Sequence, residues 1–428
     1  MLGPDDNWAS LAHVKGMTQP ASAQPVPPVV IVGGGPAGML SGLLFARAGI
    51  EVTVLEKHKD FFRDFRGDTV HPSTLQVLDE LGMLTRFLTR KHNPLDHAEL
   101  DYNGQMLKIG DLSHLHMPAR FIAMMPQWDF LDFLRDEAAA YPGFALRMEA
   151  EAVGVTESEG RVDGVRLAHG EVLPARLVLM CDGRSSLVRA MLPLESLGVP
   201  IDVFWFAVPK MTPGTALRGV VRAGRIIAMI DRGDYWQCAF VIAKGGATAI
   251  QDRGIEAFRA EVRDAAPDLP SLDAALPDWD AVRLLSVSLD RLTRWWMPGL
   301  LAIGDAAHAM SPVGGIGINL AIQDAVAMAN ILAESLAHNP SQAAIDALLP
   351  RVQHRRMFPT RMIQGAQKLA HEQILQRVIE GRKPLPARPP LALRLLDRYP
   401  LLRRIPGHFI GHGVRQEHVH TPVAITPG

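Results

Sequence analysis

The stretch that decides the fold is Val29-Val30-Ile31-Val32-Gly33-Gly34-Gly35-Pro36-Ala37-Gly38, near the start of a chain of 428 residues. Its four β-branched residues predict a short buried strand, because parallel strands covered on both faces are apolar throughout. Gly33 then permits a tight turn, Gly35 lets a pyrophosphate approach the backbone, and Gly38 lets the next helix pack close to the strand. The stretch predicts the strand, turn and helix of a dinucleotide-binding α/β domain, with a glycine-rich turn that binds no ligand as the alternative.

The residues that follow continue this pattern. A helix over 36–48 would present its N-terminal amides and the positive end of its dipole to phosphate groups. A second strand, 51–55, ends at Glu56, and a carboxylate at that place can accept hydrogen bonds from the hydroxyls of an adenosine ribose. We count Lys57, the next residue, with the same site.

A later stretch decides which dinucleotide binds. Residues 300–303 predict another buried strand that ends at Gly304 and Asp305, and the Asp305 carboxylate can accept hydrogen bonds from a ribityl chain. A loop over 310–317 with three glycines leads into a helix over about 318–335. The start of that helix, aimed at the N1–C2=O edge of a flavin, would stabilise the negative charge of the reduced ring by ~1 kcal/mol. Because no second GxGxxG fingerprint occurs, the single dinucleotide fold is predicted to bind FAD.

A third stretch, Asp182-Gly183-Arg184-Ser185-Ser186-Leu187-Val188-Arg189, lies between these two. The three motifs, in this order, resemble the single-component (group A) flavoprotein monooxygenases, the family of p-hydroxybenzoate hydroxylase. By that resemblance, Asp182 and Gly183 belong to an element shared by the FAD and NAD(P)H sites. Its arginines suit phosphate; alternatively, they pair with Asp182 and nearby acids.

The same resemblance assigns roles to individual residues. Glu56 is expected to bind the adenosine ribose and Asp305 the ribityl chain. Arg66 matches the arginine that neutralises the pyrophosphate. Gln127, which opens a helix over 127–140, matches a glutamine that contacts the chain linking the two halves of FAD.

The loop over 312–319 is expected to line the isoalloxazine ring, with Pro312 as the candidate catalytic position that faces it. The expected cofactor contacts are Gly33, Gly35, Pro36, Ala37, Gly38, Glu56, Lys57, Arg66, Gln127, Asp182, Gly183, Gly304, Asp305, Pro312, Gly315, Gly317, Ile318 and Asn319.

The resemblance implies a monooxygenase reaction on an aromatic or phenolic small molecule. NADPH or NADH would reduce FAD as a transient partner, O₂ would give a flavin C4a-hydroperoxide, and the substrate ring would take the terminal oxygen. The residues that bind phenolate and carboxylate in p-hydroxybenzoate hydroxylase have no recognisable counterparts, so its substrate is not carried over. Three alternatives share the motifs: a membrane-associated hydroxylase of the ubiquinone-biosynthesis type, an O₂-independent flavin reductase or desaturase, and a binding protein of the GDI kind without catalysis.

Composition limits the remaining possibilities. The net charge of −1 gives no electrostatic case for nucleic acid. Cys181 and Cys238, with no CxxC, favour a reducing compartment and argue against a disulfide reductase. No apolar run reaches the ~20 residues of a spanning helix and no signal peptide begins the chain, so a soluble cytoplasmic monomer or homodimer is expected. His114 and His116 lack a carboxylate or cysteine beside them, so no metal site is predicted.

The middle of the chain has a different pattern from the motifs. Short strands at 202–208, 217–221, 225–231 and 235–242, joined by glycine turns, predict an antiparallel sheet. A hairpin over 98–110 is expected to join it. Within the strands, three aromatic residues are candidates for a wall that stacks on the substrate ring, or else for the core: Trp205, Phe206 and Trp236.

The sequence therefore predicts an α/β fold with a discontinuous Rossmann-like FAD-binding domain, an inserted antiparallel β-sheet substrate domain and a helical C-terminal region. The expected parts are a disordered lead (1–28), the FAD-binding domain (29–95, 117–190 and 285–340), the substrate domain (96–116 and 191–284) and the helical region (341–428).

Two basic stretches of the C-terminal region have two interpretations each. In a helix over 344–378, Arg355 and Arg356 would bind an anion or, as we prefer, form salt bridges to the flavin domain. The stretch 391–414 mixes apolar residues with arginines, and so would lie on an anionic membrane or pack its apolar side on the protein. We prefer the second interpretation because Pro400 and Pro406 interrupt a long surface helix.

Overall fold

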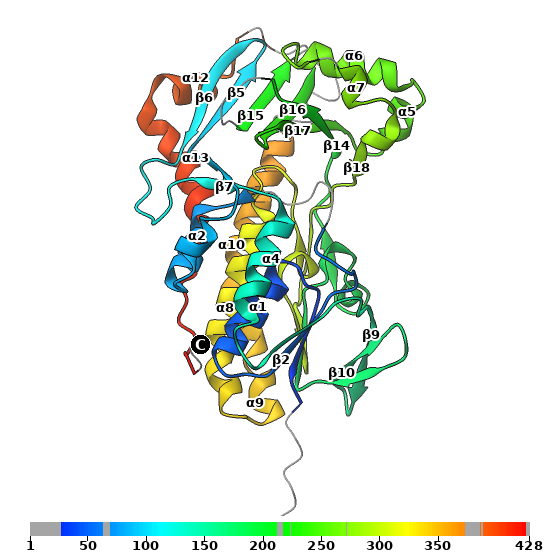
Figure 1. Cartoon of the computed structure of the whole chain (residues 1–428), viewed down its shortest axis with the longest axis vertical. Helices are drawn as coiled ribbons and strands as arrows, with labels where there is room; N and C mark the ends of the chain where they lie inside the picture. Colours follow the sequence, from blue (N-terminus) through cyan, green and yellow to red (C-terminus); the bar gives the residue numbers. More distant parts are fainter. Residues whose placement is uncertain are drawn as a thin grey trace, which may run out of the picture.

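The predicted strand at 29–32 lies inside a parallel sheet. The computed structural model describes residues 27–62, 69–211, 217–222, 224–270, 272–372, 386 and 388–424 (Figure 1). Strand β1 (Val29–Val32) is fully buried and pairs in parallel with the strands on both sides. Only the short edge strand β20 runs antiparallel. The sheet order is β20 (Trp296–Met297), β21 (Leu300–Ala302), β12 (Leu177–Met180), β1, β2 (Val52–Leu55) and β8 (Phe144–Arg147).

Helices cover one face of this sheet and a small β-meander covers the other (Figure 1). Helix α1 (Pro36–Arg47) packs against α4 (Gln127–Ala138) and α8 (Gly317–Ala337), and α10 (Leu349–Ala370) packs behind α8. The meander consists of β9 (Ala152–Ser158), β10 (Arg161–Leu167) and β11 (Val172–Pro174). The predicted α/β fold is confirmed, with the glycine motif at the junction of β1 and α1.

Helix α8 is the apolar centre of the helical layer. By length and composition alone it could cross a membrane, which the sequence was not expected to allow. However, 72% of its most apolar window is buried inside the protein, as expected of a core helix. Of the described residues, no other helix meets the same criteria.

A seven-stranded sheet forms the opposite end of the molecule (Figure 1). Its order is β18 (Arg283–Leu285), β14 (Ile201–Pro209), β17 (Tyr235–Ala243), β16 (Arg225–Asp231), β15 (Leu217–Arg222), β5 (His97–Tyr102) and β6 (Gln105–Asp111). The predicted hairpin turns at Asn103 and Gly104, both with positive φ. The prediction of an antiparallel sheet was wrong at one junction: β15 and β5 are parallel. The reason is that β5 and β6 come from an earlier excursion of the chain, which joins the edge without a hairpin.

The two faces of this sheet have different partners. Phe204, Phe206 and Phe240 pack against Phe258 of the helical layer that covers the outer face. That layer contains α5 (Ala247–Gln251), α6 (Ile255–Ala265) and α7 (Leu272–Ala275). The face on the other side, which we call the inner face, packs through Val203 and its neighbours against Val313 of the loop before α8. The inner face therefore meets the part of the parallel-sheet domain that carries the third motif.

Short elements connect the two ends. Helices α2 (Pro72–Glu80) and α3 (Leu84–Phe87) follow β3, and two small sheets lie between the large ones. One small sheet contains β3 (Thr69–Val70), β7 (Ile122–Met124) and β4 (Asn93–Leu95). The other contains β13 (Leu194–Ser196), β19 (Asp290–Leu292) and β22 (His308–Ala309).

The C-terminal region is helical only in part. The helix expected over 344–378 is divided into α9 (Gln342–Asp346) and α10, and its last residues lie outside the described part of the chain. Helices α12 (Leu391–Arg398) and α13 (Pro400–His412) follow. Residues 413–424, which we call the C-terminal segment, are extended, so the prediction of a helical region to 428 was wrong there. Hydrogen bonds join this segment to the side chains of Asn330 in α8, Glu80 in α2 and Arg47 in α1.

The apolar side of α12 and α13 is not packed on the protein as we preferred. Leu391, Leu401 and Ile405 are 66–69% exposed. Only part of the apolar side is covered, where Leu393 contacts the β5–β6 edge and Ile410 contacts the inner face. Pro400 begins α13, a position that suits proline, while Pro406 lies within it.

Candidate FAD site

The end of β1 and the start of α1 form an open cradle. A Cβ on Gly38 would lie 2.0 Å from the Gly33 carbonyl oxygen, so the helix can approach the turn only with glycine here. A Cβ on Gly35 would meet nothing within 4 Å, so space remains above the turn. Among the described residues, no side chain caps the helix start at Gly35, and its amides stay available to a phosphate. Pro36 and Ala37 form the first helical turn.

Glu56 lies at the end of β2 beside this cradle. Its carboxylate accepts hydrogen bonds from the amide of Gly34 at 3.1 Å and from the amide of His58 at 3.0 Å. These bonds fix the carboxylate next to the glycine turn, where a ribose attached to the pyrophosphate would lie. Lys57, by contrast, is exposed.

The second and third motifs, which are far apart in the sequence, are joined by arginines. Arg184 donates from Nε to the Asp305 carboxylate at 3.1 Å and from Nη2 to the Met310 carbonyl at 3.0 Å. Arg189 donates to the Asp305 carbonyl at 2.7 Å and to the Asp290 carboxylate at 2.8 Å. Of the two readings of these arginines, pairing with nearby acids is the one present, although the acids are Asp305 and Asp290 rather than Asp182.

Asp182 itself lies where the second motif leaves β12. Its carboxylate accepts a hydrogen bond from the Leu187 amide at 3.1 Å. Burial raises the pKa of Asp182, although bonds to Ser186 and Leu187 oppose the shift. Gly183 has a φ of +81° and opens a short 3₁₀ turn, Gly183–Ser185. The motif is therefore a turn that ends the central strand and directs its arginines toward the third motif.

The loop at 311–316, which we call the flavin loop, is held from two sides. On one side, Thr69 donates to the Gly315 carbonyl at 2.8 Å, and Ser73 and Thr74 both donate to the Asn319 side-chain oxygen. On the other side, Gln367 of α10 donates to the carbonyls of Ser311 and Val313 at 3.0 and 2.9 Å. The loop is therefore fixed in place before any ligand binds.

The start of α8 follows the flavin loop. No side chain caps it, so the amides of Gly317 and Ile318 remain available, as at α1. Asn319 is 3% exposed, and its side-chain oxygen is used by α2. The structure therefore gives the Asn319 side chain an anchoring role between α8 and α2, where the sequence predicted a contact with the cofactor.

The sequence reasoning missed a buried charge network behind the site. Asp324 of α8 is fully buried and accepts hydrogen bonds from the Gly304 amide at 3.1 Å, His308 Nε2 at 2.6 Å and Arg356 Nε at 2.8 Å. Burial acts to raise the pKa of Asp324, but His308 and Arg356 hold it below its ordinary value. Arg356 also donates to Glu417 at 3.1 Å. An acid in an otherwise apolar helix was the available signal.

This network shows the roles of three residues. His308 has a structural role, because its imidazole is buried between Asp324 and the ring of Trp295. Arg356 joins α10 to α8 by an ion pair, so the salt-bridge interpretation of the basic helix is confirmed there. Arg355 pairs with Glu417 of the C-terminal segment.

His71 is a further buried polar residue that the sequence did not single out. Its Nδ1 lies 3.0 Å from the Ile410 carbonyl oxygen of α13 and must donate, because a carbonyl only accepts. Its Nε2 has no hydrogen-bond partner in the described part of the chain. Burial lowers the pKa of His71, so the imidazole is neutral near pH 7. It joins α13 to the start of α2 beside Gly315.

Some predicted residues lie apart from these contacts. Gln127 begins α4, as expected. Arg66 lies outside the described residues. Cys181 and Cys238 are both buried and free, and burial raises both thiol pKa values, so these cysteines are inert core residues. Among the described residues, no group of three or more His, Cys, Asp or Glu side chains could hold a metal ion.

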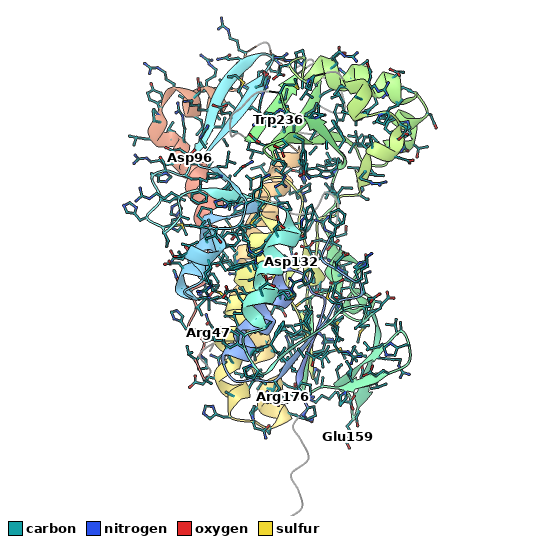
Figure 2. All side chains as sticks on the ribbon, viewed as in Figure 1. Arg47, Asp96, Asp132, Glu159, Arg176 and Trp236 are labelled. Atoms are coloured by element: carbon teal, nitrogen blue, oxygen red, sulfur yellow. The ribbon has the colours of Figure 1, made fainter. Side chains whose placement is uncertain are left out.

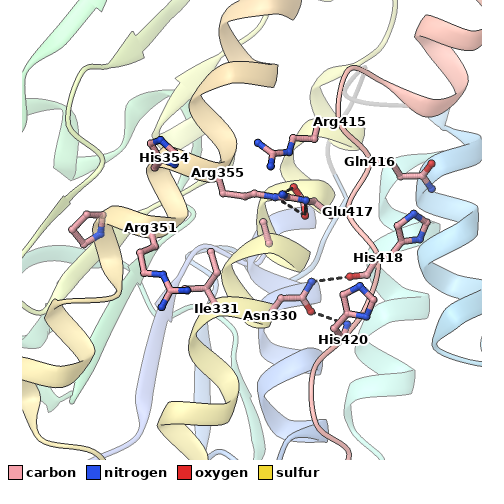
Figure 3. A pocket seen from close by; sticks show the side chains of 12 residues that line it. Asn330, Ile331, Arg351, His354, Arg355, Arg415, Gln416, Glu417, His418 and His420 are labelled. Carbon is pink, nitrogen blue, oxygen red and sulfur yellow. Dashed lines mark hydrogen bonds and ion pairs between the residues drawn. The ribbon is translucent and has the colours of Figure 1, made fainter.

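A cavity of about 600 Å³ lies away from this site, between α8, α10 and the C-terminal segment (Figure 3). Asn330 of α8 bonds to the His418 carbonyl at 2.7 Å and to the His420 amide at 2.8 Å, and Arg355 meets Glu417 across the cavity (Figure 3). None of the predicted cofactor contacts lines it. It marks where the C-terminal segment is attached to the helical layer.

The open glycine turn, the positioned Glu56 and the two uncapped helix starts fit FAD, and they define a dinucleotide-dependent oxidoreductase. Comparison with protein families agrees: the model of the FAD-binding domain family matches residues 27–366. The chain belongs to this family, and it is a flavoprotein monooxygenase that binds FAD, as the three motifs predicted.

Individual relatives are consistent with this assignment. The chain is 33% identical over 388 residues to 6-methylpretetramide 4-monooxygenase of Streptomyces rimosus, covering 88% of this chain and 90% of that protein. It is 23% identical over 364 residues to 3-demethoxyubiquinol 3-hydroxylase of Escherichia coli, covering 80% and 88%. The crystal structure of PqsL, a probable FAD-dependent monooxygenase from Pseudomonas aeruginosa, matches with a TM-score of 0.67 at 22% identity, covering 83% and 98%, which shows a common fold.

Proposed function

We propose that this flavoprotein hydroxylates an aromatic molecule with a fused or extended ring system, using O₂ and NADPH or NADH. One observation carries the proposal: Val313 of the flavin loop packs against the apolar cluster of the inner face of the seven-stranded sheet, a cluster against which Trp205 and Ala228 also pack. A ring bound on that apolar face would lie next to a flavin bound at the loop. The relative from Streptomyces rimosus, named for 6-methylpretetramide, supports a substrate of this kind.

The described residues supply distinct parts of a FAD site in this proposal. The amides at the start of α1 bind the pyrophosphate, and Glu56 binds the adenosine ribose. The amides of Gly317 and Ile318 face the isoalloxazine, where they stabilise negative charge. Asp305, held by Arg184 at 3.1 Å, accepts from the ribityl chain through its remaining lone pairs. We also propose that Arg66 neutralises the charge of the pyrophosphate.

When bound, FAD supplies the redox and oxygen chemistry, and the protein supplies position and shelter. The flavin loop is held by Thr69 and Gln367, so Pro312 and Val313 have a fixed place beside the ring. Ile410 of α13 packs with a second cluster, which joins Ile230 of the inner face to residues of the segment 95–124, and so would help to close the site. Exclusion of water matters because it prevents loss of the activated oxygen as H₂O₂.

The same proposal includes the domain division expected from the sequence, with the parallel sheet as the FAD-binding domain and the seven-stranded sheet as the substrate domain. We also propose a cytoplasmic location and a monomer or homodimer.

The first test measures oxidation of NADPH and NADH by the FAD-loaded protein in air, with single-ring phenols and with hydroxylated polycyclic compounds such as 1-naphthol and 1,8-dihydroxyanthraquinone. The expected result is stimulated oxidation together with a product that gains one oxygen from ¹⁸O₂. Oxidation with H₂O₂ as the only product would identify a compound that triggers reduction without being hydroxylated. Turnover without O₂ would replace the proposal with the reductase or desaturase alternative.

A second candidate is a membrane-associated hydroxylase of the ubiquinone-biosynthesis type. Two observations favour it: the exposed Leu391, Leu401 and Ile405 beside the arginines of α12 and α13, and the relative from Escherichia coli. Flotation of the holoenzyme with vesicles that contain anionic phospholipid, compared with neutral vesicles, separates the two candidates. Binding that requires anionic lipid and is lost in Leu401→Glu/Ile405→Glu would favour the second.

A further inference from the structure

We propose that Trp205 selects and orients the substrate by donating a hydrogen bond from Nε1 to an oxygen on its ring. We include in this site the row of small residues beside Trp205: Ala239, Ala228 and Gly219. The row forms the seat of an extended planar ring system. This inference rests on the proposed function and names the part of the inner face that would recognise the substrate.

The register of the sheet places these residues in one row. Trp205 of β14 pairs with Ala239 of β17, Ala239 pairs with Ala228 of β16, and Ala228 pairs with Gly219 of β15. Directly paired residues on neighbouring strands share a face of the sheet. The largest side chain and three of the smallest therefore follow one another across four strands.

Most positions in the rows on either side carry larger side chains. One row contains Val203, Val241 and Ile226, and the other contains Ala207, Gln237, Ile230 and Leu217. From the three small residues between these rows we infer a shallow trough that begins at the indole ring and ends at Leu100, whose Cδ1 would lie 3.0 Å from a Cβ on Gly219. Since strands lie about 4.8 Å apart, four strands span roughly 14 Å, more than one aromatic ring requires. The shape fits several fused rings lying flat.

The trough is on the correct face for the proposed reaction. Trp205, Ala228 and Ala239 belong to the cluster that Val313 of the flavin loop joins. Trp205 also packs with the cluster that contains Ile410 of α13. Its neighbour Phe206 faces the other way, toward α6, where no flavin would lie. Trp205 thus lies between the flavin loop and the helix that helps to close the site.

Trp205 has an unused hydrogen-bond donor. Its Nε1 is buried and has no hydrogen-bond partner in the described part of the chain, although part of the side chain remains exposed. A buried donor without a partner destabilises a fold, and buried indole N–H groups usually have a hydrogen-bond partner. Because indole N–H can only donate, the missing partner is an acceptor, such as a carbonyl or phenolic oxygen.

The contrast with Trp295 supports this assignment. Trp295 is fully buried, and its Nε1 donates to the Leu292 carbonyl at 3.0 Å. The fold therefore satisfies the indole of a structural tryptophan but leaves the one on the inner face unsatisfied. The four residues of the row carry no charge, so recognition there depends on ring shape and one neutral donor.

The experiment compares Trp205→Phe, which keeps an aromatic ring but removes the donor together with part of the ring area, with Trp236→Phe as a matched control that loses the same atoms. Trp236 lies on the same sheet but packs against the outer cluster (Figure 2). Binding of 1-naphthol and of naphthalene to the FAD-loaded proteins is followed by the change in flavin absorbance, without nicotinamide or turnover. We expect Trp205→Phe to weaken 1-naphthol about tenfold, to leave naphthalene unchanged, and to be as resistant to urea as the parent. Trp236→Phe should leave both affinities unchanged.

A second variant tests the trough. Ala228→Leu/Ala239→Leu should exclude 1,8-dihydroxyanthraquinone while phenol still binds. Equal losses for 1-naphthol and naphthalene in Trp205→Phe, or no loss, would overturn the role of the donor. Retained anthraquinone binding in the double variant would overturn the trough. Because these are binding measurements, a failure of hydroxylation would count against the proposed function alone.

Discussion

The two large sheets of this protein present their functional residues in opposite ways. The parallel sheet places glycine turns and acids at the ends of its strands, and each appears as a contiguous motif. The seven-stranded sheet presents a face, and its residues are separated in sequence and brought together only by strand register. The contiguous motifs of the parallel sheet can be recognised in the sequence, so the cofactor chemistry common to a family can be predicted from them. The residues that we propose to select the substrate come together only through strand pairing, so they cannot be recognised in the same way.

The two regions are also held in place by different kinds of interaction. Behind the parallel sheet, hydrogen bonds and buried ion pairs fix the flavin loop and α8, and Asp324 is at their centre. The inner face is held by apolar contacts and carries Trp205 Nε1, a polar atom that has no partner among the described residues. Polar bonds therefore hold the cofactor side, whereas apolar contacts hold the face that we propose for the substrate.

The largest expected effect comes from breaking the charge network on the FAD side. Arg356→Met removes one partner of a fully buried pair and should lower the free energy of unfolding by about 3–5 kcal/mol, with loss of FAD. Arg355→Met is the matched control, since Arg355 also binds Glu417 but is 37% exposed, and it should cost less than about 1 kcal/mol. Urea unfolding and retained FAD measure both. Equal losses of stability and of FAD in the two variants would show that the buried ion pair contributes no more than the partly exposed one.

A smaller effect is expected at the cradle. Glu56→Gln keeps the size of the side chain but removes the charge that would bind ribose hydroxyls, so the Kd for FAD should rise on the order of tenfold. Titration of the apoprotein with FAD, followed by flavin fluorescence, measures it. Glu51→Gln, an exposed acid at the start of the same strand, should leave the Kd unchanged. An unchanged Kd for Glu56→Gln would remove Glu56 from the site.

The next prediction concerns the outer face of the seven-stranded sheet. Phe206→Leu removes part of a fully buried ring that contacts Phe258, and should cost less than about 1.5 kcal/mol of stability. Substrate affinity should not change, because Phe206 lies on the face away from the flavin loop. Urea unfolding and 1-naphthol binding are compared with the parent protein. A change in affinity without a change in stability would mean that the two faces are not independent.

The smallest effect is a change in acid sensitivity. The pKa of Asp324 in the folded protein lies below its ordinary value of 3.8. Its contribution to stability is therefore complete above that pH and is lost as the pH falls through the lower, folded-state value. Thermal unfolding of Asp324→Asn from about pH 2 to about pH 5, a range that spans the ordinary pKa of an aspartate, should show a flatter pH dependence than the parent, with the difference below about pH 4. Parallel curves would contradict this.

The sequence was sufficient to predict the parallel sheet, because Val29–Val32 and Gly33 to Gly38 constrain local backbone strongly. It was also sufficient for FAD and for the strands of the second sheet. It was not sufficient to tell that Trp205 faces inward and Phe206 outward, because a strand alternates its faces and the pattern alone does not say which face meets the flavin. The parallel junction of β15 and β5 was missed for a related reason: pairing between distant strands leaves no local signal.

The charge network was missed because its members are distant in sequence. Asp324 and Arg356 are 32 positions apart, and Arg356 and Glu417 are 61 positions apart. Each residue alone has an ordinary local pattern: an acid in an apolar helix, an arginine in a basic helix, and an acid near several histidines. Only the packing of α8, α10 and the C-terminal segment shows that the charge of Arg356 is compensated by the two acids.

The attachment of Glu417 to Arg356 has a consequence for biosynthesis. The protein is made from its N-terminus, so the strands and glycine turn of the FAD site emerge from the ribosome long before Glu417 does. Until Glu417 arrives, Arg356 lacks one of the acids that compensate its buried charge. We therefore expect nascent chains stalled before residue 417 to release FAD faster than chains that extend past it, so that cofactor capture becomes durable only after Glu417 has joined the fold.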